Sequence, residues 1–117
     1  MELVAFLGND KENWGQIVAL INRAEWDKII LVKNKNAEGF TASKNYEIID
    51  VNSERPLVEL KNEIMNKLRE KLSGFEAALS IASGNGKEHM ALISALLSMP
   101  MGIRLVVFTK EGVEYIN

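Results

Sequence analysis

The sequence predicts an α/β fold, in which a mostly parallel five-stranded sheet is covered by helices and carries a sixth, antiparallel strand at its edge. Three observations predict it. Short apolar runs alternate along the chain with longer segments of helical periodicity, as in strand–helix–strand units. Most of the short runs are almost continuously apolar, as buried parallel strands are. The last two runs are joined only by Thr109–Gly112, which is too short for a parallel crossover.

Length and composition indicate one domain, residues 1–117, with 47% apolar residues and a net charge of −2. That charge does not favour direct DNA or RNA binding or an anionic membrane. The absence of cysteine and the single histidine exclude thiolate and multi-histidine metal sites, and we expect no metal and no cofactor. No basic leader opens the sequence, and the longest apolar run is broken by two serines and ends at Pro100. We therefore expect a cytoplasmic domain.

The first half of the chain predicts two buried strands around one helix. The run 3–7 reads as a strand that ends in the turn Gly8-Asn9-Asp10, where Asp10 is placed to cap the following helix. The apolar face of that helix consists of Trp14, Ile17, Val18, Leu20, Ile21 and Ala24. Residues 29–32 form a second strand. The polar stretch 33–45 is predicted to be a solvated loop rather than a nucleic-acid patch.

The second half predicts an edge strand, an amphipathic helix, a central strand and a terminal pair. Residues 46–51 are mixed in character, as edge strands are. Pro56 suits the first turn of a helix whose leucines and isoleucine recur every three or four residues as far as Leu72. Ser73-Gly74 ends that helix. The run 75–82 predicts a central strand, and 103–108 and 113–116 predict the antiparallel pair.

The helix predicted over residues 87–99 is apolar around more than half of its circumference. A helix packed on a sheet needs an apolar stripe only somewhat wider than ~100°. Two interpretations remain open, a deeply buried core helix and a subunit interface. We favour the interface, because little of the chain is left to cover the surplus; its centre would be Leu92, Ala95, Leu96 and Met99.

The turn before this helix, Ser-Gly-Asn-Gly-Lys-Glu-His at 83–89, is a candidate anion site. A strand, a glycine turn and a helix in that order place free N–H groups and a helix N-terminus together, and Lys87 adds a charge. The turn satisfies neither common nucleotide motif. Glu88 stands where a Walker loop needs a hydroxyl, and His89 stands where the dinucleotide fingerprint needs a glycine. A plain turn is the alternative.

The order of elements places this turn at a predicted crevice. Right-handed crossovers favour the strand order 3-2-1-4-5, a Rossmann-like three-layer sandwich, with the last strand antiparallel at the far edge. Strands one and four are then neighbours at the topological switch point, where ligands of open α/β sheets bind. The turns 8–10 and 83–87 meet there, which favours a ligand site.

The chain resembles the CRISPR-associated Rossmann-fold (CARF) domains over nearly its whole length. The resemblance lies in the first strand with Leu7-Gly8-Asn9, in the run Trp26–Val32, and in the turn and helix start Ser83–Ala91. Two features depart from the family. The segment between strands two and three is too polar for the usual second helix, and no nuclease or DNA-binding effector domain is expected within these residues.

The resemblance implies a homodimer that binds cyclic oligoadenylate, cyclic tetra-adenylate first, across its two-fold axis. The implied ligand-binding residues are Gly8, Asn9, Asp10, Trp14, Ser83, Gly84, Asn85, Gly86, Lys87 and His89. Stacking of the Trp14 indole on an adenine is one role that the resemblance allows, but its place on the apolar face of the first helix favours core packing. His89 would contact the ligand or cap the helix.

Three functions follow as hypotheses. The first is a sensor or sink for cyclic oligoadenylate in CRISPR type III signalling. The second is a metal-independent ring nuclease, in which Lys87 and Ser83 would be catalytic by positioning a ribose hydroxyl and stabilising charge. The third is an unrelated Rossmann-like nucleotide-binding or structural protein that shares only the topology.

Overall fold

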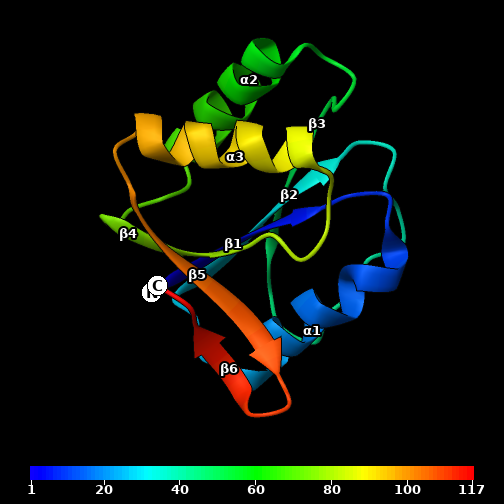
Figure 1. Ribbon diagram of the computed structural model, residues 1–117, viewed down its shortest axis with the longest axis vertical. Helices are drawn as coiled ribbons and strands as arrows, with labels where there is room; N and C mark the ends of the chain where they lie inside the picture. The colour runs from blue at the N-terminus through cyan, green and yellow to red at the C-terminus, as the bar shows by residue number, and fades with distance from the viewer.

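The computed structural model describes residues 1–117 as one six-stranded sheet with three helices, a Rossmann-like α/β fold (Figure 1). The strand order is β3-β2-β1-β4-β5-β6, parallel except for the antiparallel pair β5–β6, which confirms the predicted topology. The strands are β1 (Glu2–Leu7), β2 (Lys28–Asn34), β3 (Glu47–Val51), β4 (Glu76–Ser80), β5 (Gly102–Thr109) and β6 (Gly112–Tyr115). The helices are α1 (Trp14–Arg23), α2 (Leu57–Arg69) and α3 (Gly86–Ser98).

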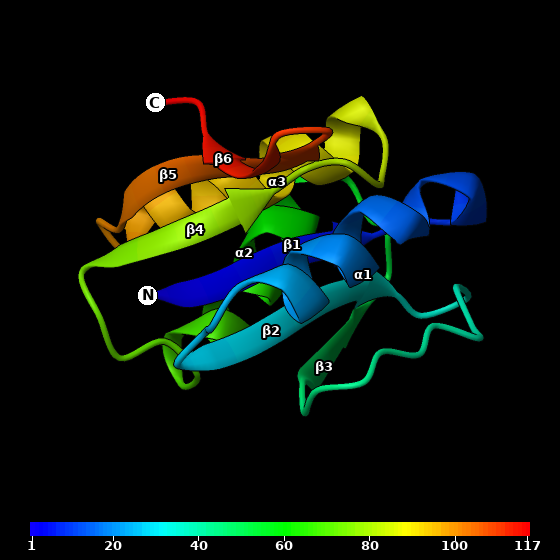
Figure 2. The same ribbon diagram turned by 90° about the horizontal axis from the view of Figure 1, so that it is seen from below.

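The sheet separates two apolar cores. Helices α2 and α3 lie on one face and α1 on the other, as Figures 1 and 2 show. Alternate residues of each inner strand point to opposite faces, so Val4 and Phe6 of β1 pack under α2 and α3, while Leu3, Ala5 and Leu7 pack under α1. All five are fully buried. Burial on both faces explains the continuous apolar sequence of β1.

The connection between β2 and β3 contains no helix, as its polarity predicts, but it is not simply a solvated loop. Ala37 is 1% exposed, and the Phe40 ring lies edge-on to Trp14 at 5.7 Å and to Tyr46 at 5.6 Å between centroids. Edge-to-face aromatic pairs stabilise such a contact beyond their buried area. The loop therefore packs beside α1 and covers part of the face that a second helix would cover.

The observed element ends differ from the predicted ones at several points. Strand β2 runs on to Asn34, because Lys35 continues the pairing with Val51 through its backbone N–H. Strand β4 is shorter than predicted, and the ring of Phe75 is 94% exposed rather than buried in the sheet. Pro56 is the residue that precedes α2, and that helix ends at Arg69 instead of Leu72.

The prediction that Asp10 caps the first helix is wrong. A short 3-10 turn, Lys11–Asn13, precedes α1, and the carboxylate of Asp10 makes no capping hydrogen bond to it. The carboxylate instead reaches across to the loop between β4 and α3.

The far edge of the sheet is formed by the β5–β6 hairpin. Beyond β6, the side-chain amide of Asn117 continues the pairing: its Nδ2 donates to the Ile103 carbonyl, and its Oδ1 accepts from the Leu105 N–H. None of the three helices combines the length and the apolar character that crossing a bilayer requires.

Candidate functional site

The candidate site lies at the carboxyl ends of β1 and β4, which pair directly at the switch point. Hydrogen bonds join the two loops that follow these strands. Oδ1 of Asp10 accepts from the Ser83 hydroxyl at 2.7 Å and from the Gly84 N–H at 2.9 Å. The Gly8 N–H donates to the same Ser83 Oγ at 2.9 Å. These bonds fix one wall of the site.

Gly8 is required where the two loops touch. A Cβ at this position would lie 2.7 Å from the Gly84 Cα and 2.7 Å from Asp10 Oδ1, closer than real Cβ contacts. Gly84 has a φ of +105°, a conformation that L-residues with side chains rarely adopt. Glycine at both positions therefore permits the close approach of β1 and β4 at this end of the sheet.

The first turn of α3 fixes a second wall. Asn85 and Glu88 form a capping box: Asn85 Oδ1 accepts from the Glu88 N–H, and Glu88 Oε1 accepts from the Asn85 N–H, both at 2.9 Å. The other oxygen of Glu88 accepts from the Ser53 hydroxyl at 2.5 Å, and Lys87 Nζ donates to the Ser53 carbonyl at 2.8 Å. Two successive residues of α3 thus hold the loop between β3 and α2.

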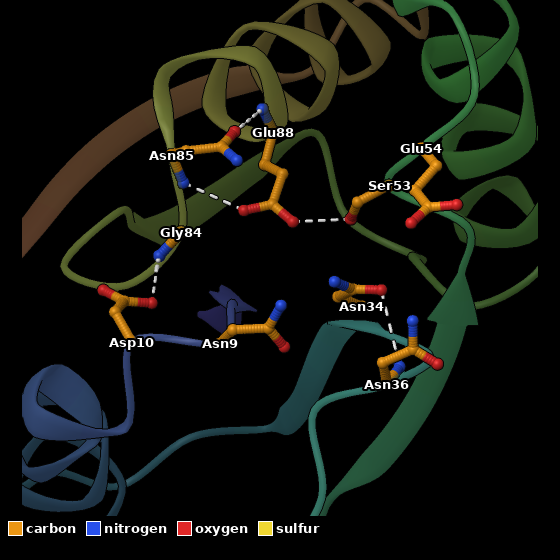
Figure 3. A pocket seen from close by; sticks show the side chains of 9 residues that line it. All are labelled: Asn9, Asp10, Asn34, Asn36, Ser53, Glu54, Gly84, Asn85 and Glu88. Carbon is orange, nitrogen blue, oxygen red and sulfur yellow. Dashed lines mark hydrogen bonds between the residues drawn. The ribbon is translucent and has the colours of Figure 1, made fainter.

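A polar crevice of about 430 Å³ lies between these walls (Figure 3). Its lining comes from the loops after β1, β2, β3 and β4 and from the start of α3, and none of it is hydrophobic. The nine lining residues are Asn9, Asp10, Asn34, Asn36, Ser53, Glu54, Gly84, Asn85 and Glu88. A volume of this size is ordinary for a small-molecule site, but such sites are usually mostly apolar. The crevice therefore suits a polar ligand or part of one.

The crevice carries negative charge, from Asp10, Glu54 and Glu88, and neither lysine nor arginine lines it. Burial alone raises the pKa of Asp10, but hydrogen bonds from Asn13, Ser83 and Gly84 outweigh it and lower the pKa below its ordinary value. Asp10 is therefore ionised at neutral pH. No group of three or more acidic or histidine side chains converges closely enough to hold a metal ion.

Three of the predicted ligand-binding residues use their polar groups in hydrogen bonds within the protein. Ser83 is fully buried, with its hydroxyl bonded to Asp10 and Gly8, so it is neither a ligand contact nor a catalytic group. The Gly8 N–H is used by the same hydroxyl. Trp14 is 8% exposed, donates its indole N–H to the Gly8 carbonyl at 3.1 Å and packs in the core. Its prediction as an adenine-stacking residue is wrong, because its ring is covered.

The other residues of the predicted turn have mixed positions. Asn9, Asp10, Gly84 and Asn85 line the crevice, although the Gly84 N–H is already bonded to Asp10. The His89 ring N–H donates to the Ser83 carbonyl at 2.7 Å, so this side chain stabilises the loop.

Two backbone donors remain at the start of α3. The capping box uses the amides of Asn85 and Glu88, and none of the bonds to side chains or loops involves the amides of Gly86 and Lys87. Those two N–H groups, with the Lys87 ammonium, are what remains of the predicted anion site.

The predicted interface residues are buried within the subunit. Leu92, Ala95 and Leu96 are fully buried and pack with α2, and Met99 packs partly against the same core. The apolar surplus of α3 is covered by α2, which lies beside it (Figure 1). A different stripe of α3 is exposed, with Met90 58% and Leu97 59% exposed and Ile93 half-buried between them.

Sequence reasoning missed five of the lining residues, namely Asn34, Asn36, Ser53, Glu54 and Glu88. Four of them lie at or within three residues of the carboxyl ends of β2 and β3, at the same edge of the sheet as the two predicted turns. The rule that ligands bind at the carboxyl ends of parallel strands applies equally to those strands and would have found them. Comparisons with family models, curated proteins and solved structures find no match to this chain.

Proposed function

We propose that the chain is a binding module for cyclic oligoadenylate, with cyclic tetra-adenylate the first candidate, acting as a sensor or sink in CRISPR type III signalling. The observation that carries the proposal is the wholly polar crevice at the β1–β4 switch point. The resemblance to CARF domains supports it, since the loops that carry the resemblance border this crevice. Amide and carboxylate groups are suited to the ribose hydroxyls and base edges of a nucleotide.

The size of the crevice supports binding by two copies of the chain. A volume of about 430 Å³ suits one nucleotide unit better than a whole ring of four. An even-membered ring has approximate two-fold symmetry, so a two-fold homodimer would offer the same donors and acceptors to each half. Each copy would then hold a unit on its own side of the axis.

The exposed stripe of α3 is the proposed dimer surface, and its proposed occupant is the same stripe of a second copy. Met90, Ile93 and Leu97 are spaced by three and four residues and share one side of the helix with Ser94 and Ser98. A two-fold interface needs such a self-complementary patch. The stripe begins at Gly86 and His89, in the helix turn that borders the crevice, so pairing there would bring the two crevices side by side.

The proposal is tested by mass spectrometry of the purified protein with cyclic tri-, tetra- and hexa-adenylate. Native spectra report a complex of two chains with one ring, and denaturing spectra of the ligand report any linear product. Formation of the 2:1 complex with an intact ring is expected. Slow conversion to linear products would make the protein a ring nuclease. Failure of all three rings to bind would leave an unrelated nucleotide-binding or structural protein.

A further inference from the structure

An amide donor with no partner in the protein lies at the end of β2 and faces the crevice. Asn34 is only 7% exposed, and its Oδ1 accepts from the Asn36 N–H at 3.4 Å. No protein acceptor bonds its Nδ2, which is directed into the crevice (Figure 3). Every fully buried polar side-chain atom of the protein has a hydrogen-bond partner, so this Nδ2 is reached by solvent through the crevice. A group bound in the crevice can replace that solvent as the acceptor.

The surroundings of this donor exclude an anionic partner. The carboxylates of Asp10, Glu54 and Glu88 line the same crevice, and no lysine or arginine lines it with them. A phosphate placed among these groups would be repelled at close range. Carboxylates instead accept hydrogen bonds from hydroxyl and amino groups, while Asn34 Nδ2 needs an acceptor. The complementary group is neutral and carries both donors and acceptors.

We propose that the crevice is a nucleoside subsite in which Asn34 Nδ2 donates to the ribose or base of one nucleotide, while the phosphate stays outside it. The inference rests on the proposed function, because it assigns part of the same ligand to the crevice. The phosphate would lie at the rim, where Gly86 and Lys87 begin α3 with unused N–H groups. Asn34 is then a ligand-binding residue, and the predicted phosphate turn is only the border of the subsite.

The substitution Asn34→Asp tests the role of the Nδ2 donor. The aspartate keeps an oxygen for the Asn36 N–H but replaces the free donor with a negatively charged acceptor. We expect affinity for the ligand to fall about tenfold or more, because an acceptor of the ligand loses its partner and meets a fourth carboxylate. Asn66→Asp, on the exposed side of α2, introduces the same charge away from the crevice and serves as the matched control.

Nuclear magnetic resonance of the side-chain amide groups tests the inference, with adenosine, cyclic tetra-adenylate and inorganic phosphate as probes. We expect adenosine and the ring to shift the Asn34 amide signals, phosphate to leave them unchanged, and Asn34→Asp but not Asn66→Asp to weaken binding. A ring that binds the wild type and Asn34→Asp equally, with the Asn34 signals unmoved, would overturn the inference and leave the proposed function standing.

The remaining outcomes separate the two proposals further. Adenosine that binds through Asn34 without any binding of the ring would support the nucleoside subsite and contradict the proposed function. Phosphate that shifts the Asn34 amide, or failure of both adenosine and the ring to bind, would overturn the inference.

Discussion

Removal of the Asp10 carboxylate should destabilise the junction between β1 and β4. Oδ1 accepts from Ser83 Oγ and from the Gly84 N–H, and Oδ2 accepts from Asn13 Nδ2 at 2.7 Å. Asp10→Ala leaves the hydroxyl of the fully buried Ser83 without its acceptor. Asp10→Asn keeps one oxygen for Ser83 and Gly84, but it removes the charge and replaces Oδ2, the acceptor of the Asn13 amide, with a donor.

The magnitude follows from the bonds lost. A hydrogen bond to a charged group contributes about 1.5–3 kcal/mol, and such values are not additive within one network. We therefore expect Asp10→Ala to lower the free energy of unfolding by about 3 kcal/mol, which for a domain of this size lowers the Tm by roughly 10–15 °C. Asp10→Asn should cost about 1–2 kcal/mol, because the charge assistance of the bonds from Ser83 and Gly84 is lost together with the exposed bond from Asn13.

The pH dependence gives an independent measure. The pKa of Asp10 is lowered in the folded protein, because its hydrogen bonds outweigh the effect of burial. The ionised group therefore stabilises the fold above its ordinary pKa of 3.8, and this contribution is lost as the pH falls further through the folded-state pKa. The stability difference between wild type and Asp10→Asn should be full at pH 7 and should decrease as the pH falls below 3.8, towards the lowered pKa of the folded state.

Urea unfolding followed by circular dichroism measures both effects. Glu12→Ala is the control, since Glu12 is an exposed carboxylate in the same segment. An Asp10→Ala variant within about 0.5 kcal/mol of the wild type would refute the reasoning, because surface changes alone produce differences of that size. A difference between wild type and Asp10→Asn that is constant from pH 7 to pH 3 would refute the account of ionisation.

Three further predictions concern the loop junction, α3 and Lys87. In thermal unfolding, Gly8→Ala should destabilise the fold by about 2 kcal/mol or more, because the added Cβ meets backbone atoms. Gly15→Ala should stabilise the fold by about 0.5 kcal/mol, because there is open space around its added Cβ. Leu96→Glu should unfold the subunit, since this side chain is fully buried. Leu97→Glu, on the exposed stripe of α3, should keep the helical circular dichroism but yield monomers in sedimentation. A folded Leu96→Glu monomer would contradict the assignment of the two helix faces. Lys87→Ala should weaken ring binding about tenfold in calorimetry with little change in fold, and unchanged affinity would exclude Lys87 from the site.

The strand order could be predicted from the sequence because it depends on features that are local in the chain. Apolar runs mark the buried strands, and the handedness of crossovers then leaves few arrangements. The antiparallel end followed from the length of the connection 109–112 alone. The packing partner of α3 could not be predicted in the same way. The apolar width of a helix indicates how much surface is covered, but not whether α2 or a second subunit covers it.

The meeting of the two turns at the candidate site could be predicted from the sequence, but the bonding of their polar groups could not. The turns at Gly8 and Ser83 do meet at the switch point, as predicted. Their polar groups bond mainly to each other, however, and the hydroxyl of Ser83 is buried as a result. Residue type cannot separate a group that binds a ligand from one that joins two loops. Asn34 was missed because β2 extends two residues beyond its apolar run, through Lys33 to Asn34.

The edge formed by β5, β6 and Asn117 restricts how copies of this chain can associate. An edge strand with unpaired N–H and C=O groups is a template for pairing with another sheet. Here both outer strands are short and carry acidic side chains, Glu47 and Asp50 on β3 and Glu114 on β6. The amide of Asn117 occupies the positions on β5 at which a foreign strand would add. Growth of the sheet from molecule to molecule, the first step of amyloid-type aggregation, is therefore opposed at both ends.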